Sequence, residues 1–316
     1  MPNLHPQVVK ALEAMARLNL KPIEAMDPPE AREQMEKMAA SRRAETLPIA
    51  RTEDRTIPGP GGAIPVRIYW PNVAGARETP LPAIVYYHGG GHVIGSLDSH
   101  DLIARNLCGG AEAIIVSIDY RMGPEHRFPA AVDDSMAGLL WVHANAATIG
   151  ADPDRLGVHG DSAGANLAAV VALMARDRGG PTLRLQSLVY PVADFRMETE
   201  SYTTFATGCG VLTAEAMKWF RGHYLRSMED ALDWRASPLL APDLARVAPA
   251  IVIAAECDVL HDEGLAYSDR LKAAGVPVER HEYAGMIHAF FGMMPALDDA
   301  MNAQRAVWAA FKRAFA

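Results

Sequence analysis

The clearest chemical pattern in the sequence is GDSAG at residues 160–164, which lies between an apolar segment and a strongly helix-forming one. At a junction of strand and helix, GxSxG predicts a tight, strained turn that exposes the serine hydroxyl, because small flanking residues let the two elements approach closely. A glycine-flanked serine can also simply cap a helix. Ser162 is therefore a candidate nucleophile, and it needs partners elsewhere in the chain.

A serine hydroxyl reacts only when a base takes its proton, so a carboxylate and a histidine should follow later strands. Asp258 follows the apolar segment AIVIAAE, and His288 follows VERHEY. Both positions suit the carboxyl ends of parallel strands, where active sites lie in such sheets. We expect His288 to transfer the proton and Asp258 to orient the imidazole and stabilise its cation.

Other residues near these two positions have the same chemistry. Glu256 and Asp262 flank the candidate acid, and His261 and His281 are further imidazoles. His281 falls inside an apparent strand, which favours a structural role, and Glu256 lies nearer the end of its own strand. These four residues stay open as alternatives.

Three glycines stand between two histidines in HGGGH, residues 88–92, directly after the apolar segment AIVYY. A phosphate-binding loop is disfavoured, because neither GxxxxGK[ST] nor a GxGxxG that opens a helix is present. A metal site on His88 and His92 would need a helix, which three glycines disfavour. No metal is therefore expected at these histidines.

An oxyanion hole explains the glycines better, because side chains would block the approach of the backbone to a developing negative charge. We expect the N–H groups of Gly89, Gly90 and Gly91, above all the last two, to act with that of Ala163. His88 would support this loop without reacting.

The elements that must position these groups follow an alternating pattern. Short apolar strands alternate with helical segments from about residue 83 onwards, which predicts a mostly parallel sheet covered on both faces. Residues 52–71 predict an antiparallel hairpin around PGPGG. Helical periodicity dominates before residue 50, where Met15, Met35 and Met38 are expected to form contact surface, and a long segment interrupts the alternation from about Phe195 to Pro249.

Composition excludes several classes of protein. The chain has 316 residues, half of them hydrophobic, and a net charge of −8 without a basic run, so no nucleic-acid partner is expected. Neither a membrane span nor a signal peptide is apparent, and we expect a cytoplasmic protein. Cys108, Cys209 and Cys257 lack metal or disulfide spacing and are expected to be buried thiols.

The sequence resembles the bacterial carboxylesterases that are similar to mammalian hormone-sensitive lipase, from about Pro65 to the C-terminus. The resemblance implies an α/β-hydrolase fold with a helical cap, no cofactor, and hydrolysis of short- to medium-chain acyl esters. It assigns Ser162, Asp258 and His288 to a catalytic triad and the HGGG glycines with Ala163 to the oxyanion hole. The motifs that carry it are HGGG (88–91), DYRMGPEHRFPAAVDD (119–134), GDSAGANLA (160–168), LVYPVAD (188–194), DVLHDEG (258–264) and GMIHAF (285–290).

The resemblance also predicts how the chain is divided. Residues 1–50 should form the N-terminal part of the cap, and residues 51–316 the catalytic domain, with a cap insertion at about 195–248. Three positions depart from the family: His92 where an aromatic residue is common, Gly123 in place of alanine, and Ala289 in place of glycine. These departures bear on substrate preference. We expect the substrate pocket to include His92 and Asp161.

The function favoured by these residues is that of a serine carboxylesterase that forms an acyl-enzyme. An amidase or a thioesterase would use the same triad, and a ligand receptor can keep the fold without catalysis. The expected partner is a small-molecule ester. The sequence leaves a monomer and a homodimer both open, and it does not identify the natural substrate.

Overall fold

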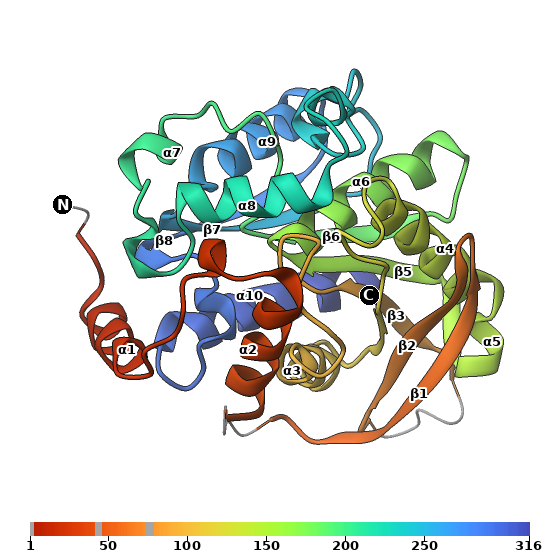
Figure 1. The fold of residues 1–316 in the computed structure, drawn as a ribbon. Coiled ribbons are helices and arrows are strands. Elements are labelled where there is room, and N and C mark those ends of the chain that lie inside the picture. The colour runs from red at the N-terminus through yellow and green to blue at the C-terminus, as the bar shows by residue number, and fades with distance from the viewer. Residues whose placement is uncertain (1–2, 42–45, 74–78) are drawn as a thin grey trace.

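A computed structural model describes residues 3–41, 46–73 and 79–316 of the chain. Within them, one eight-stranded sheet has the order β1-β2-β4-β3-β5-β6-β7-β8 (Figure 1). The six strands from β4 to β8 in this order are parallel, and β1 and β2 are antiparallel additions at one edge. The prediction of a mostly parallel sheet is therefore confirmed. The strands are β1 (Ile49–Gly59), β2 (Gly62–Pro71), β3 (Leu81–Tyr87), β4 (Ile114–Ile118), β5 (Ala151–Asp161), β6 (Leu183–Val189), β7 (Ala250–Cys257) and β8 (Val278–Ile287).

The predicted hairpin is also present, because β1 and β2 pair antiparallel with Gly59 opposite Gly62. Gly62 has φ 126°, a conformation that glycine adopts without the strain of a side chain. This hairpin lies beside β4 and away from the strands that follow β3 in the sheet. It extends the sheet at the edge opposite β8.

Helices cover both faces of the sheet (Figure 1). Side chains of β3 alternate between the two faces: Ile84 and Tyr86 belong to the apolar cluster that includes α3 and α10. Val85 and Tyr87 belong to the cluster that includes α4, α6 and α9. The apolar strand segments are buried on both sides for this reason. The helices are α3 (Asp101–Ala111), α4 (Ala130–Ala144), α5 (Ala146–Ile149), α6 (Ala163–Asp177), α9 (His261–Ala273), α10 (Asp298–Phe315) and the short η5 (Phe290–Gly292).

Two further groups of helices lie outside the sheet and the helices that cover its faces. One precedes β1, and the other lies between β6 and β7, in the segment that interrupts the alternation of strands and helices. They meet where the indole Nε1 of Trp219 donates to the carbonyl of Met26 at 3.1 Å. Residues 1–2 and 42–45 of the expected N-terminal part lie outside the described residues. The two groups comprise α1 (Pro6–Ala16), η1 (Ile23–Ala25), α2 (Pro28–Ser41), α7 (Ser201–Thr204), η2 (Gly208–Gly210), α8 (Ala214–Tyr224), η3 (Asp230–Leu232) and η4 (Pro238–Leu240).

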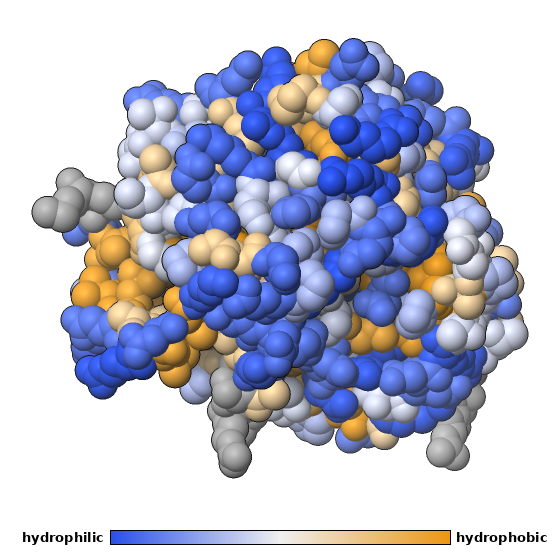
Figure 2. Space-filling view, in the orientation of Figure 1, coloured by the Kyte–Doolittle hydropathy of each residue, from blue (hydrophilic) through white to orange (hydrophobic). Residues whose placement is uncertain are grey.

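The visible surface is largely hydrophilic, with apolar side chains gathered near α1 (Figure 2). In the described part of the chain, every helix is too short or too polar to cross a bilayer. Cys108 and Cys257 are buried as expected, whereas Cys209 is half-buried, because it lies in the surface turn η2.

Candidate active site

Ser162 occupies the turn between β5 and α6. Its backbone has φ 55° and ψ −118°, a strained conformation that persists only where the surrounding structure enforces it. A Cβ on Gly164 would collide with the carbonyl oxygen of Tyr87, and one on Gly160 with that of Gly164. The two glycines of GxSxG are therefore required by the close approach of α6 to β3 and β5. The serine hydroxyl lies at the carboxyl end of the sheet.

Ser162, His288 and Asp258 lie next to one another. The Nε2 atom of His288 is 3.0 Å from Oγ of Ser162, and its Nδ1 atom is 2.7 Å from Oδ2 of Asp258. The other carboxylate oxygen of Asp258 accepts a hydrogen bond from the N–H of Leu260 at 3.0 Å. The three side chains follow β5, β7 and β8, whose carboxyl ends lie at one edge of the sheet. This geometry allows the imidazole to take the serine proton while the carboxylate holds its Nδ1–H.

The alternative acids and bases point elsewhere. Glu256 accepts a hydrogen bond from the N–H of Gly285 at 2.6 Å, and Asp262 accepts one from Ser201 at 2.7 Å. His261 contacts Asp262, and His281 is paired with Glu279 at 2.8 Å, two residues away on the same face of β8. Each of these four groups is engaged in a contact that supports a neighbouring loop or strand.

The three glycines after β3 each touch another part of the site. A Cβ on Gly89 would collide with the carboxylate of Asp161, one on Gly90 with the carbonyl of Ile94, and one on Gly91 with the ring of Phe220. Gly90 and Gly91 also have φ of 119° and 60°. Within the described residues, the N–H groups of these two glycines donate no backbone hydrogen bond, which leaves them available to a ligand.

His88 lies beneath this loop. Its Nδ1 atom is 2.8 Å from the carbonyl oxygen of Gly89, and its ring stacks on Tyr120 with centroids 4.4 Å apart. The hydroxyl of Tyr120 in turn donates to the carbonyl of His88 at 2.7 Å. Burial lowers the pKa of His88 to about 3, so its imidazole is neutral near pH 7.

His92 does not lie where it was expected. It is fully buried and stacks on Tyr224 of α8 with centroids 3.9 Å apart, and the residues that line the cavity do not include it. Burial lowers its pKa to about 3. The carbonyl of His92 accepts a hydrogen bond from Gly123 at 2.8 Å, and a Cβ on Gly123 would collide with the backbone of His223. The departures at 92 and 123 therefore belong to one contact between the loop and α8.

A cavity of about 490 Å³ opens beside Ser162 and His288. Asp161 is among its lining residues. Its walls come from both groups of outer helices as well as from the sheet, and they are mainly apolar. The apolar lining includes Met15, Leu20, Ile23, Met35, Met38, Ile94, Val211, Leu212, Met217 and Phe220.

Several contacts at the site have no recognisable signal in the sequence. Tyr190 lines the cavity with its ring 4.6 Å from that of His288, and it has φ 36°. Arg32 of α2 donates to the carbonyls of Val93 and Gly123 at 2.8 and 2.7 Å. Such contacts join segments far apart in the chain, so neither periodicity nor motif spacing indicates them.

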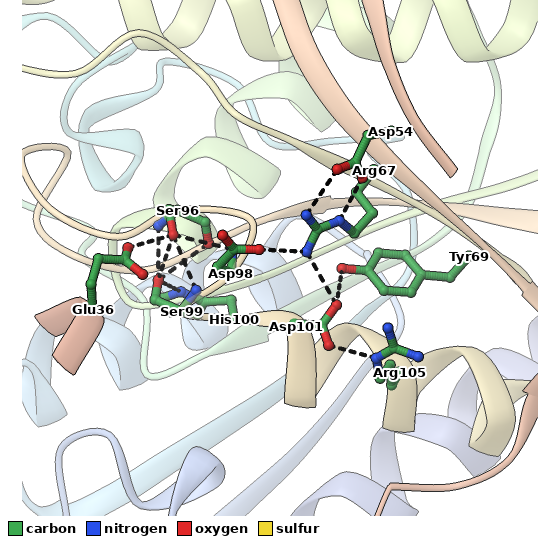
Figure 3. A network of polar contacts seen from close by, with 10 residues as sticks. All are labelled: Glu36, Asp54, Arg67, Tyr69, Ser96, Asp98, Ser99, His100, Asp101 and Arg105. Atoms are coloured by element: carbon green, nitrogen blue, oxygen red, sulfur yellow. Dashed lines mark hydrogen bonds and ion pairs between the residues drawn. The ribbon is translucent and has the colours of Figure 1, made fainter. Parts of the chain in front are cut away.

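A polar network connects α2 to the loop that follows the glycines (Figure 3). The hydroxyl of Ser96 donates to Glu36 at 2.5 Å, and the N–H of Ser96 donates to Oγ of Ser99 at 2.8 Å. Oγ of Ser99 is 2.9 Å from Nδ1 of His100, another cavity-lining residue. The segment 96–100 is thus fixed on one side by the N-terminal helices.

The same network reaches the edge of the sheet. Arg67 of β2 contacts Asp54, Asp98 and Asp101, and the hydroxyl of Tyr69 donates to Asp101 at 2.9 Å (Figure 3). These contacts attach the start of α3 to the hairpin strand.

Among the described residues, no group of three or more His, Cys, Asp or Glu side chains could hold a metal ion. The groups at the site instead resemble the parts of an acyl-transfer centre: a serine beside a base, a carboxylate behind the base, and free N–H donors nearby. The apolar cavity next to them suits an uncharged organic ligand.

Comparison with known proteins agrees with this chemistry. A family model described as alpha/beta hydrolase fold matches residues 84–292. Carboxylesterase NlhH of Mycobacterium tuberculosis is 43% identical over 274 residues, which cover 85% of each chain. Carboxylic ester hydrolase LipN of the same organism is 46% identical over 246 residues, which cover 76% of this chain and 64% of LipN.

A solved structure is similar over nearly the whole length. The hyperthermophilic esterase from the archaeon Pyrobaculum calidifontis is 41% identical, with a TM-score of 0.92 and 99% of both chains covered. The similarity therefore extends to the outer helices as well as to the sheet.

Proposed function

We propose that this chain, which belongs to the hormone-sensitive-lipase-like family of α/β-hydrolases, hydrolyses short- to medium-chain acyl esters through an acyl-enzyme. It is a carboxylic ester hydrolase like its relatives. The observation that carries the proposed mechanism is the pair of contacts at His288, 3.0 Å from Ser162 Oγ and 2.7 Å from Asp258.

In the proposed first step, Oγ of Ser162 attacks the ester carbonyl carbon while Nε2 of His288 takes the hydroxyl proton. The carbonyl oxygen becomes an oxyanion, and Asp258 stabilises the imidazolium through Nδ1. The tetrahedral intermediate then collapses, and His288 returns the proton to the departing alcohol. Water attacks the acyl-enzyme by the same route, with His288 as base, and releases the carboxylic acid and free Ser162.

The oxyanion would be held by the N–H groups of Gly90, Gly91 and Ala163. The N–H groups of the two glycines donate no backbone hydrogen bond within the described residues, and Ala163 begins α6 directly after the nucleophile. Each such donor is typically worth about 10²–10³ in rate. Gly89 would set the course of the loop, because its Cα packs against the carboxylate of Asp161.

The substrate class follows from the cavity. Its volume of about 490 Å³ and its mainly apolar walls suit a short- to medium-chain acyl group with its alcohol part. We propose that residues 1–50 and the insertion at about 195–248 act together as the cap that supplies most of these walls. Met15, Met35 and Met217 are the side chains through which the cap would contact the acyl chain.

The test of this function is Ser162→Ala. We expect the variant to lose measurable hydrolysis of a p-nitrophenyl ester and to unfold at the wild-type temperature, because only the hydroxyl at a turn is removed. An organophosphate should label wild-type protein once, at Ser162, as found by peptide mass spectrometry. Labelling at another serine, or hydrolysis by the variant at the wild-type rate, would contradict the proposal.

The choice of leaving group needs a separate comparison. Rates on a p-nitrophenyl ester, the matching anilide and the matching thioester should be measured with the same acyl chain. We expect the oxygen ester to be preferred, because an amide needs stronger protonation of its leaving group. A higher kcat/KM for the anilide or the thioester would favour an amidase or a thioesterase on the same triad.

A further inference from the structure

A second acidic side chain lies beside the proposed nucleophile. Asp161 directly precedes Ser162, its side chain is 8% exposed, and it lines the same cavity. Its Oδ1 atom accepts a hydrogen bond from the hydroxyl of Tyr86 at 2.8 Å. Its Oδ2 atom packs against Gly89, at the start of the proposed oxyanion loop. The proposed reaction would build a new negative charge near a buried carboxylate that is already charged.

The pKa of the Asp161 carboxyl lies below its ordinary value, which favours the ionised form near pH 7. Burial raises this pKa, but the nearby His100 and the hydrogen bond from Tyr86 outweigh burial and hold it at about 2. An ionised carboxylate in such a place repels an oxyanion unless a cation compensates it.

Two of the nearby histidines cannot provide that cation. His88 and His159 are fully buried, and burial lowers their pKa to about 3 and about 4. His159 also keeps Nδ1 within 2.9 Å of the hydroxyl of Ser187. Both rings are therefore neutral near pH 7.

His100 stands in the right place with the right partners. Its Nε2 atom is 3.6 Å from Oδ2 of Asp161, and its Nδ1 atom is 2.9 Å from Oγ of Ser99. Oγ of Ser99 also lies 3.2 Å from the carbonyl oxygen of Ser96, to which it donates. A hydroxyl has one proton, so when Ser99 donates to Ser96 the Nδ1 atom of His100 must itself be the donor.

The rest of the network supports this arrangement (Figure 3). The hydroxyl of Ser96 is 2.5 Å from Glu36, and its proton goes to that carboxylate. Oγ of Ser99 accepts from the N–H of Ser96 at 2.8 Å, and the Ser96 carbonyl at 3.2 Å can take its own proton. Nδ1 of His100 is then a donor, and Nε2 on the other side of the ring faces Oδ2 of Asp161 at 3.6 Å.

We propose that His100 is a positioning residue for ester hydrolysis: its imidazolium pairs with Asp161 and cancels the charge that would otherwise oppose the oxyanion. This inference rests on the proposed function, since it concerns the oxyanion formed on attack by Ser162. Glu36 and Ser99 would favour the doubly protonated ring from the side of α2. The N-terminal helices would thus contribute to the chemical step as well as to the pocket walls.

The test is to replace His100 with glutamine in two backgrounds, with Asp161 present and with Asp161→Asn. With Asp161 present we expect kcat for a p-nitrophenyl ester to fall by roughly 10- to 100-fold. This is the effect of one uncompensated unit charge on an oxyanion several ångströms away, at an effective dielectric constant near 20. KM should change far less. In the Asp161→Asn background, His100→Gln should change kcat by no more than about threefold, since no charge is left to compensate. Both chemical steps pass through an oxyanion, so kcat reports whichever is slower.

His159→Gln is the matched control, because it removes an equally buried imidazole that is neutral. We expect its kcat to stay within about threefold of wild type, as for a change that removes no charge. Should His100→Gln fail to fold, Ser99→Ala removes the acceptor of Nδ1–H. It should lower kcat only where Asp161 is present.

Two results would overturn the inference: an equal loss from His100→Gln in both backgrounds, or no loss in either. The first would make His100 a purely structural residue. Activity that survives in Ser162→Ala would instead overturn the proposed function, and the two failures are thereby distinguished.

Discussion

Ser162, Asp258 and His288 follow strands of one hydrogen-bonded sheet, whereas Met35 and Met217 reach the same cavity from helices outside it. The register of β5 to β8 positions the first group through backbone hydrogen bonds on both sides of each inner strand. The second group depends on scattered contacts, such as the 3.1 Å hydrogen bond from Trp219 to Met26. Under the proposed function, the chemistry would lie on strands joined by continuous backbone hydrogen bonds, and the choice of acyl chain on helices held by fewer contacts.

The largest effect should come from the sheet region, on breaking the contact behind the imidazole. We expect Asp258→Asn to lower kcat by roughly 10³–10⁴, because an asparagine amide does not hold Nδ1–H of His288 in the correct tautomer. Steady-state hydrolysis of a p-nitrophenyl ester measures this loss. Glu256→Gln is the control: its amide oxygen can still accept from Gly285, so kcat should stay near wild type. An equal loss in both variants would contradict the assignment of Asp258.

The contact of His92 with Tyr224, where the glycine loop meets α8, should make the free energy of unfolding depend on acidic pH. Burial lowers the pKa of His92 to about 3, below the value near 6.5 of an unfolded histidine, so only the unfolded chain gains a proton between these pH values. Stability is therefore lost as pH falls below 6.5, by about 2 kcal/mol for this residue at pH 5. His92→Phe keeps an aromatic ring stacked on Tyr224 but removes the imidazole that binds a proton in the unfolded chain.

Urea unfolding of wild type and His92→Phe at pH 7 and pH 5 measures that difference. The variant should lose less stability on acidification, while His88 and His159 continue to contribute in both proteins. An identical loss in the two proteins would show that His92 is already protonated or exposed in the folded state.

A smaller change is expected from the outer helices. Met35→Ala should enlarge the acyl end of the cavity and raise kcat/KM for longer esters relative to shorter ones, by up to about tenfold, because each buried methylene is worth about 0.8 kcal/mol. A series of p-nitrophenyl esters of increasing chain length measures the shift. Met228 is 54% exposed and lies outside the cavity lining, so Met228→Ala should leave the profile unchanged. If both variants keep the wild-type chain-length profile, α2 does not line the part of the cavity that binds the acyl chain.

The smallest effect concerns Ala289, which lies next to His288 with φ 64°. Glycine at this position should stabilise the protein by about 0.5–1 kcal/mol, since the left-handed conformation costs alanine more than glycine. Thermal unfolding measures the gain. The control is Ala309, exposed in the middle of α10, where glycine should instead destabilise by about 1 kcal/mol. A loss of stability at both positions would show that the strain at Ala289 is negligible.

Much of the fold was accessible from the sequence, because local patterns carry the required information. Alternation of apolar segments predicts a covered parallel sheet, PGPGG predicts the hairpin, and GxSxG predicts the strained turn at Ser162. The glycines at 89–91 predicted a loop that has no room for side chains. The structure shows which neighbouring residue a Cβ at each of these positions would collide with. These features depend on backbone geometry within a few residues, which composition and spacing report directly.

Other features required the tertiary structure, because they depend on which distant segments meet. Glu256 and Asp258 are two residues apart and equally acidic, yet only Asp258 contacts His288, while Glu256 contacts Gly285. His92 was expected in the pocket and instead packs behind the loop against Tyr224. The pairing of His100 with Asp161 joins the start of α3 to the end of β5. Sheet order and helix docking decide such contacts, and a periodic pattern in one segment contains no information about its partner.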